Sequence, residues 1–415
     1  MEMRNPSPQP RSGPPAPGPH AQALGPAPSG GKGEARDRLQ RALAHQEPDR
    51  VPFDLGGTGL TTLHVTAYRN LRQYLGLPPV DVRVAHMAEQ LADVDEDVAD
   101  RLQADVRPVR PGFPEGFQYT FEDQGAYEAY HDEWGIGWRK PRDGGFYYDM
   151  YDHPLAGAGS VDELLAYPFP DPLDPARFAS LRSDAEAVLA TGRAAVLAGP
   201  CSGIAEMVSW MRGYENFYID LAANPDMITA LLDRLVDFKC AYWERALAEV
   251  GDLVDVVIEA DDLAGQHGML LSPRTYRRLI KPRHARLFSF IKATAPVKIF
   301  FHSCGAVRPI IPDLIEAGID ILNPVQVSAA GMDPQELKRE FGRDLVFWGG
   351  GVDTQQVLGT GTPQQVRDDV RRNVEALAPG GGFVFAAVHD IQANVPPENI
   401  VAMWEAWRDF GVRSS

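Results

Sequence analysis

The segment V-K-I-F-F-H-S-C-G, residues 297–305, ends a strand-like apolar run in an imidazole, a thiol and a glycine. His302 and Cys304 are two positions apart, so in an extended segment their side chains point to the same side. Both are good zinc ligands, because zinc binds imidazole nitrogen and thiolate sulfur. Alternatively, His302 only ends the strand and Cys304 is a small buried apolar residue. Because H-x-C supplies two ligands, a metal site needs more from elsewhere in the chain.

Strand-like runs alternate with helical stretches on both sides of this segment. Helical periodicity is clear at residues 34–43, 225–250, 308–317, 334–341 and 363–377. The strand-like runs are at residues 51–55, 104–109, 194–199, 254–259, 297–302, 319–323, 345–349 and 383–388. Eight strands alternating with helices predict an α/β fold of the (β/α)8 TIM-barrel type. A doubly wound sheet is the alternative, but no G-x-G-x-x-G opens a helix after an early strand.

Composition divides the chain into a tail and one domain. Residues 1–34 are rich in Pro and Gly and have few large apolar side chains, so we expect a disordered tail followed by one barrel domain at 35–415. A long aromatic insertion, residues 111–174, follows the second predicted strand. We expect it either to cover the active face as a lid or to pack beside the barrel without contacting a ligand.

The net charge, the apolar runs and the cysteine number of the sequence disfavour several classes of function. The net charge of −17 argues against a nucleic-acid surface, and no apolar run is long enough to span a membrane. No secretory signal is visible at the start of the sequence, and three scattered cysteines do not make a disulfide framework. We therefore expect a cytoplasmic protein that acts on a small molecule. The oligomeric state is not fixed by the sequence, and a homodimer is one option.

The predicted strands end in polar residues. In a barrel these ends meet at one face, where active sites lie. His389 follows an apolar run as His302 does, so it is the best third metal ligand, with Glu259 or Asp261 as possible oxygen ligands. Alternatively, His389 and Asp390 only make hydrogen bonds where a loop begins. The candidate site residues are His302, Cys304 and His389 for metal, Asp54, Glu259 and Asp261 for catalysis, and Asn323, Gln326, Asp353 and Gln392 for substrate binding.

At these residues the chain resembles the uroporphyrinogen decarboxylase superfamily, over about residues 36–412. The resemblance rests on F-H-S-C-G at 301–305, I-L-N-P-V-Q at 321–326, F-W-G-G-G-V-D at 347–353 and P-P-E-N-I at 396–400. It implies a (β/α)8 barrel with the active site in its mouth. It also implies one of two chemistries: cofactor-free decarboxylation of uroporphyrinogen, or zinc-dependent methyl transfer to or from a corrinoid on a partner protein.

The motifs are more similar to those of the methyltransferase branch, which has H-x-C after strand five and a cysteine after strand eight. His302 and Cys304 match the first motif, whereas His389 stands in place of the later cysteine. The resemblance therefore implies a zinc ion, made more Lewis-acidic by the neutral imidazole, and a corrinoid supplied by a partner protein.

Decarboxylation is the alternative. The decarboxylases carry R-Q-A-G-R after strand one, but residues 54–62 here contain no arginine, and Arg107, Arg110 and Arg139 are the cations left for a polyanionic substrate. A third possibility is a barrel that binds a ligand without catalysis.

Overall fold

A computed structural model describes residues 34–412 of the chain. The predicted tail lies outside the described residues, apart from Glu34, which begins the first helix. No helix in the described part of the chain is long and apolar enough to cross a membrane.

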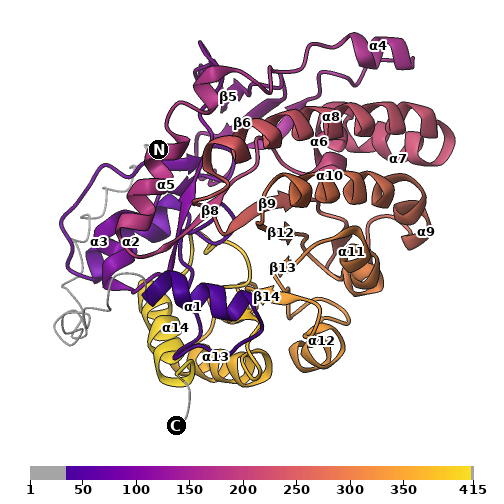
Figure 1. Cartoon of the computed structure of the whole chain (residues 1–415). Coiled ribbons are helices and arrows are strands. Elements are labelled where there is room, and N and C mark those ends of the chain that lie inside the picture. The colour runs from indigo at the N-terminus through magenta and orange to yellow at the C-terminus, as the bar shows by residue number, and fades with distance from the viewer. Residues whose placement is uncertain (1–33, 413–415) are drawn as a thin grey trace, which may run out of the picture.

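Seven parallel strands form one curved sheet (Figure 1). Their order in the sheet is β15-β14-β13-β12-β9-β8-β3, which follows the order of the chain, as expected for a β/α barrel. The strands are β3 (Val106–Val109), β8 (Ala194–Leu197), β9 (Val256–Ala260), β12 (Lys298–His302), β13 (Ile321–Asn323), β14 (Val346–Trp348) and β15 (Phe383–Val384).

The eighth position of the barrel is filled by the segment predicted as the first strand. Phe53 forms a parallel bridge with Phe385, and the Asp54 backbone N–H donates to the Phe385 carbonyl at 2.8 Å. On the other side, the Asp105 backbone N–H donates to the Phe53 carbonyl at 2.8 Å. Pro52 has no N–H to donate, and the segment makes an isolated bridge instead of a regular strand. It nevertheless lies between β15 and β3, which confirms the predicted (β/α)8 barrel.

The barrel interior is a separate apolar cluster that includes Phe300, Trp348 and Val256. Apolar residues of α1 (Glu34–Leu43) join this cluster from one end. The Gly382 N–H donates to the Ala42 carbonyl at 3.1 Å just before β15 begins, so α1 covers the N-terminal ends of the strands. The opposite end, where the strands finish, is the face at which the active sites of such barrels lie.

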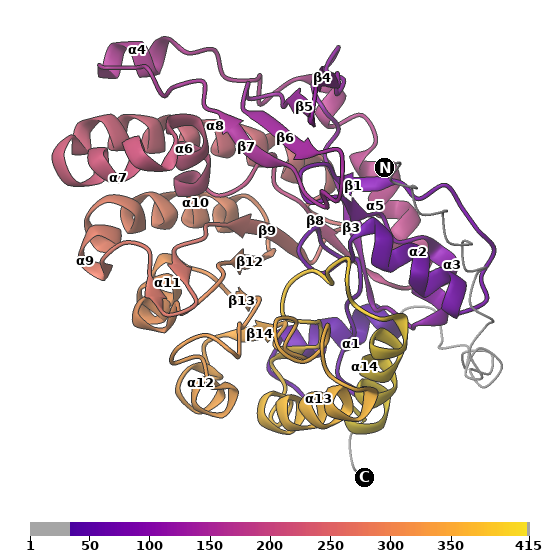
Figure 2. The same cartoon turned by 180° about the vertical axis from the view of Figure 1, so that it is seen from behind.

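Helices surround the sheet (Figures 1 and 2). The bounds predicted for α1, α8 (Pro225–Val250), α12 (Pro334–Phe341) and α13 (Pro363–Leu377) are confirmed. Proline in the first turn marks three of these four starts, because its missing N–H is unpaired there in any case. The other helices are α2 (Val65–Tyr74), α3 (Glu96–Arg101), α4 (Val161–Ala166), α5 (Leu181–Ala190), α6 (Ile204–Arg212), α7 (Tyr214–Ala223), α9 (Pro273–Thr275), α10 (Lys281–Thr294), α11 (Ile311–Ala317) and α14 (Pro397–Phe410).

The insertion contains a second sheet, which the sequence did not predict. Four antiparallel strands pair in chain order, β4 (Glu122–Gln124), β5 (Tyr127–His131), β6 (Gly137–Pro141) and β7 (Asp149–Asp152). Figure 2 shows this sheet along the side of the barrel next to α6 and α8. Its aromatic residues pack there, with Trp138 and Trp210 ring centroids 5.6 Å apart and Trp134 and Phe238 centroids 4.9 Å apart. Most of the insertion is therefore a packed layer on the helices.

Two short hairpins complete the fold. One joins β1 (Val84–His86) to β2 (Leu91–Ala92), and the other joins β10 (Ala264–Gly265) to β11 (Gly268–Met269). The β1–β2 hairpin precedes β3 in the chain, and the β10–β11 hairpin follows β9.

Candidate metal centre

The structure brings together the three residues predicted as metal ligands. His302 is the last residue of β12, and its Nε2 lies 3.4 Å from Sγ of Cys304. The ring of His389, which follows β15, has its centroid 5.1 Å from that of His302. One potential ligand atom from each of the three residues lies within 4.8 Å of the other two. Two nitrogens and one sulfur at this spacing suit a zinc ion with one open coordination position.

Local backbone geometry turns these side chains toward one another. Gly305 has φ of +83°, and a Cβ there would lie 2.6 Å from the carbonyl oxygens of Ala264 and Gly265. Glycine therefore allows the turn that follows Cys304. His389 has φ of +68°, which is uncommon for a residue with a side chain and places its ring beside His302.

Asn323, predicted to bind substrate, is instead the hydrogen-bond partner of His302. Its Oδ1 lies 2.5 Å from His302 Nδ1, and its Nδ2 donates to the Trp348 carbonyl at 2.8 Å. The second bond orients the amide so that its oxygen faces the imidazole. His302 then carries its proton on Nδ1 and leaves the Nε2 lone pair facing Cys304, which is how histidine binds a metal.

Gln326, also predicted to bind substrate, holds the loop that carries Cys304. Its Oε1 accepts from the Gly305 N–H at 2.7 Å, and its Nε2 donates to Gln266 at 2.6 Å. Gln326 is buried. These two bonds use both ends of its amide to fix the turn.

Carboxylates that were not among the predicted ligands lie next to the cluster. Asp262 Oδ1 accepts from the Cys304 N–H at 2.7 Å and lies 3.7 Å from His302 Nε2. Glu89, in the β1–β2 hairpin, forms a second potential ligand group with His389 and Asp390. Asp262 follows Asp261 in the sequence and could have been found from that strand end. Glu89 carries no such signal, because it precedes a two-residue strand.

The electrostatic surroundings of the cluster suit a divalent cation. Burial raises the pKa of the Cys304 thiol well above its usual range, and the negative charges of Asp262 and Glu206 raise it further. Burial also lowers the pKa of His389 to about 4, and the nearby His302 adds to this shift. The surroundings of the cluster thus disfavour both the thiolate form of Cys304 and the protonated form of His389. A divalent cation removes the first penalty and binds the neutral imidazole, so these residues fit zinc.

Asp54, a predicted catalytic residue, is enclosed by hydrogen-bond donors. Its carboxylate accepts from the Gly57 N–H and the Thr61 hydroxyl, both at 2.8 Å, and from Trp348 Nε1 at 2.7 Å. Burial raises its pKa to about 6. Asp54 therefore ties the loop after the first barrel segment to the barrel interior.

The other two predicted catalytic residues do not join the cluster. Glu259 points away from the barrel interior, because residues alternate along β9, and its carboxylate accepts from Lys239 at 2.8 Å and Trp243 at 2.6 Å. Asp261 is also buried, with its Oδ2 2.7 Å from His284 Nε2. Neither Glu259 nor Asp261 belongs to the potential ligand group around His302, and Asp262 is the acidic residue of this strand end that lies beside His302.

The remaining predicted residues, Asp353 and Gln392, lie in the segments that follow β14 and β15. Asp353 accepts from the Gln355 N–H at 2.8 Å and so shapes its own turn. Gln392 accepts from the Tyr147 hydroxyl, while its Nε2 donates to the Asp390 carbonyl at 3.0 Å. Tyr147 belongs to the insertion, so one loop of that segment reaches the barrel mouth.

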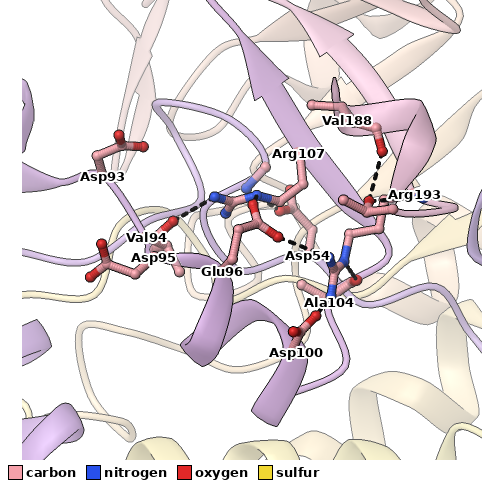
Figure 3. A network of polar contacts seen from close by, with 12 residues as sticks. Asp54, Asp93, Val94, Asp95, Glu96, Asp100, Ala104, Arg107, Val188 and Arg193 are labelled. Atoms are coloured by element: carbon pink, nitrogen blue, oxygen red, sulfur yellow. Dashed lines mark hydrogen bonds and ion pairs between the residues drawn. The ribbon is translucent and has the colours of Figure 1, made fainter. Parts of the chain in front are cut away.

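The arginines left for a polyanionic substrate each have a partner in the chain, but within the described residues Arg107 Nη1 and Arg110 Nη2 are buried and make no hydrogen bond. Figure 3 shows Arg107 bonded to Glu96, at 2.8 Å, and to the Val94 carbonyl, at 2.6 Å. Arg110 pairs with Asp93 at 3.1 Å. The Arg139 guanidinium stacks on the ring of Tyr127, 4.7 Å from its centroid.

Comparisons with known proteins agree with this architecture. Residues 160–410 match the uroporphyrinogen decarboxylase (URO-D) family. A protein named uroporphyrinogen decarboxylase from Alkalilimnicola ehrlichii is 24% identical over 393 residues, which cover 91% of this chain and 94% of that protein. A solved structure of a methyltransferase from Methanosarcina mazei superposes with a TM-score of 0.60 at 19% identity, and covers 91% of this chain and 98% of that one. The chain belongs to the uroporphyrinogen decarboxylase family.

Proposed function

We propose that the protein is a zinc-dependent methyltransferase that moves a methyl group between a small methylated substrate or thiol and a corrinoid. The observation that carries this proposal is the grouping of His302, Cys304 and His389 within 4.8 Å at the C-terminal end of the barrel. The likeness of the fold to that of a methyltransferase supports it.

His302, Cys304 and His389 would hold the metal and leave one position for substrate. A zinc ion held there would supply Lewis acidity, which would lower the pKa of a coordinated thiol or polarise a coordinated oxygen. Asn323 keeps the Nε2 lone pair of His302 directed at the metal position, and Gln326 fixes the turn after Cys304. The described residues are accounted for by the barrel and its insertion, so we propose that a partner protein brings the corrinoid to the mouth.

Decarboxylation of a tetrapyrrole is the second candidate, because the curated relative carries the name of that enzyme. It requires cations for the substrate carboxylates. Arg107 and Arg110 are bonded to Glu96 and Asp93, and no arginine occurs at residues 54–62. Each of these two arginines thus shares its charge with a carboxylate of the chain, which favours methyl transfer over a substrate with many carboxylates.

Metal content separates the two candidates. We expect about one zinc per chain in protein purified without chelators, measured by inductively coupled plasma mass spectrometry. His302→Ala combined with Cys304→Ala should abolish it. Cys240→Ala is the matched control, because it removes a thiol on α8, away from the cluster, and should leave the zinc in place.

An activity assay follows from the metal result. With zinc bound, methylcobalamin offered together with a panel of thiols should be demethylated, which is visible in its absorption spectrum. Stoichiometric zinc in the wild type together with loss of turnover in the double variant supports the proposal. Wild-type protein without zinc that converts a porphyrinogen would refute it in favour of the decarboxylase.

A further inference from the structure

We propose that Tyr147, in the loop between β6 and β7, is a specificity-determining residue whose ring closes one side of the barrel mouth and limits the size of the molecule that reaches Cys304. The inference rests on the proposed function and deepens it, because it concerns the substrate of the same site. Tyr147 lies outside residues 160–410, the part of the chain that matches the family.

The hydroxyl of Tyr147 is bonded to the segment that carries His389. It donates to Oε1 of Gln392, three positions after His389 in the chain. Gln392 Nε2 donates in turn to the Asp390 carbonyl at 3.0 Å, so the amide that accepts from Tyr147 is itself held against the backbone next to His389. One end of the Tyr147 side chain is therefore fixed beside the metal cluster.

The next residue of the loop is bonded to the hairpin that carries Glu89. The Tyr148 backbone N–H donates to the Ala88 carbonyl at 2.8 Å. Glu89 offers a carboxylate oxygen within 4.8 Å of a ligand atom of His389. Burial raises the pKa of the Tyr147 hydroxyl, and the charge of Glu89 raises it further, so the hydroxyl lies within reach of that charge. Tyr147 thus lies between two segments that meet at His389.

The ring of Tyr147 is held as well. It meets the imidazole of His64 edge to face, with ring centroids 5.4 Å apart, and the ring of Phe146 meets the same imidazole at 5.7 Å. His64 Nδ1 accepts from the Thr66 N–H at 3.0 Å, so Nε2 carries the proton and donates to the Phe146 carbonyl at 3.1 Å. Packing on one edge and a hydrogen bond at the hydroxyl therefore give the Tyr147 ring one position in the mouth.

A fixed ring at this place selects substrates by size. Tyr147 is half-buried, so part of its surface meets molecules that enter the mouth. One extra methylene group against a packed wall changes the specificity of an enzyme by about 10–200-fold. We therefore expect small thiols or small methylated substrates to be accepted, and those with a bulky group beside the reacting atom to be rejected.

Anchoring of the insertion to the barrel is the competing role for Tyr147. Tyr147→Phe removes the hydroxyl and keeps the ring, whereas Tyr147→Ala removes both. A ring that excludes by size predicts that only Tyr147→Ala differs from the wild type, while an anchor predicts that the two variants behave alike. Tyr218→Ala is the matched control, because it removes an exposed tyrosine of α7 whose ring packs on Phe217.

Alkylation of Cys304 in chelator-treated protein tests the inference without zinc. The reagents are iodoacetamide, which is small, and pyrene maleimide, which is bulky, and peptide mass spectrometry separates Cys304 from Cys201 and Cys240. Both reagents attack the thiolate, so the ratio of their rates cancels any change in the pKa of the thiol. We expect the ratio of the bulky to the small reagent at Cys304 to rise about tenfold in Tyr147→Ala. It should keep the wild-type value in Tyr147→Phe and Tyr218→Ala.

Turnover tests the same residue with substrates. Methylcobalamin is offered with 2-mercaptoethanol or with the bulkier phenylmethanethiol. In Tyr147→Ala the KM of phenylmethanethiol should fall about tenfold relative to that of 2-mercaptoethanol, because the wall that excludes the phenyl ring has been removed. Tyr218→Ala should keep the wild-type ratio of the two KM values.

The outcomes separate this inference from the proposed function. A wild-type ratio of alkylation rates in Tyr147→Ala overturns the inference and leaves the metal centre standing. Equal ratios in Tyr147→Phe and Tyr147→Ala assign only an anchoring role and also overturn it, as does an equal rise at Cys201 and Cys240, which would show general loosening. Wild-type protein that binds no zinc overturns the proposed function, while the alkylation rates still decide whether Tyr147 limits access to Cys304.

Discussion

The amide of Asn323 lies between the imidazole of His302, 2.5 Å from its Nδ1, and the carbonyl of Trp348, 2.8 Å from its oxygen. His302 ends β12, Asn323 ends β13 and Trp348 ends β14, so one side chain connects three consecutive strand ends. The tautomer of the candidate ligand is therefore fixed by the barrel itself.

Two substitutions of Asn323 should separate the role of its amide oxygen, which faces His302, from that of its amide nitrogen, which donates to the Trp348 carbonyl. Asn323→Ala removes both bonds, and we expect zinc affinity to fall about 10–100-fold and unfolding free energy to fall by about 1–3 kcal/mol. Asn323→Asp keeps an acceptor for His302 but faces the Trp348 carbonyl with a carboxylate oxygen, so it should lose stability and retain most of the affinity. Chelator competition and urea unfolding measure the two effects. Equal losses of affinity in both variants would contradict this assignment.

Zinc binding should release a proton from Cys304. Because burial and then Asp262 raise the pKa of this thiol well above its usual range, the thiol is protonated in the metal-free protein at neutral pH. The apparent zinc affinity should therefore rise about tenfold per pH unit between about pH 6 and 8. Calorimetry in buffers of different ionisation enthalpy counts the proton. A pH-independent affinity in that range would show that the thiolate exists before the metal arrives.

Glu259 should affect stability and leave metal binding unchanged. Its carboxylate is buried against Lys239, at 2.8 Å, and Glu259→Gln leaves that ammonium without its counter-charge. We expect a loss of about 3–5 kcal/mol in unfolding free energy with unchanged zinc content. Lys239→Met combined with Glu259→Leu removes both charges and should recover most of the loss. If folded Glu259→Gln bound less zinc than the wild type, the result would show that Glu259 contributes to metal binding.

Asp54 should make stability depend on pH. Its pKa is about 6 in the folded protein, against 3.8 for the free group, so between these values the folded state binds a proton that the unfolded state has lost. The stabilisation from this group is complete below about pH 4 and is lost as pH rises through 6. The unfolding free energy of the wild type minus that of Asp54→Asn should therefore fall by about 2–3 kcal/mol between pH 4 and 7.

A control for this pH dependence is available beside Asp54. Thr61→Val removes the hydroxyl that donates to the carboxylate at 2.8 Å and stabilises its charged form. The pH range over which the contribution of Asp54 to stability is lost should then extend to higher pH. A difference between wild type and Asp54→Asn that stays constant with pH would show that Asp54 has an ordinary pKa.

The barrel could be predicted from the sequence because its signals are local. Helix periodicity and proline at the first turn gave the bounds of α8, α12 and α13, and the alternation of strands with helices gave the fold. The sheet of the insertion was missed, because its four strands are three to five residues long and aromatic residues occur on both of their faces.

The grouping of His302 with His389 could be predicted because both residues follow apolar strand-like runs. Glu259 could not be placed correctly from the same signal. It lies one residue out of phase with the inward-facing positions of β9, and a one-residue change of phase moves a strand side chain to the opposite face. Asn323 and Gln326 were found at the right strand end, but their hydrogen-bond partners come from other strands and depend on the three-dimensional register.

The closing segment of the barrel also has a consequence for synthesis. The Val51 carbonyl accepts a hydrogen bond from the indole of Trp407, 356 positions later in the chain. Phe53 can form its parallel bridge only after Phe385 has been made. Until residues 383–407 join the fold, β14 and β3 are two unpaired sheet edges, which are open to pairing with other chains. Residues 383–407 thus complete the pairing of residues 51–53, and a chain cut before residue 383 would be expected to aggregate or to depend on chaperones.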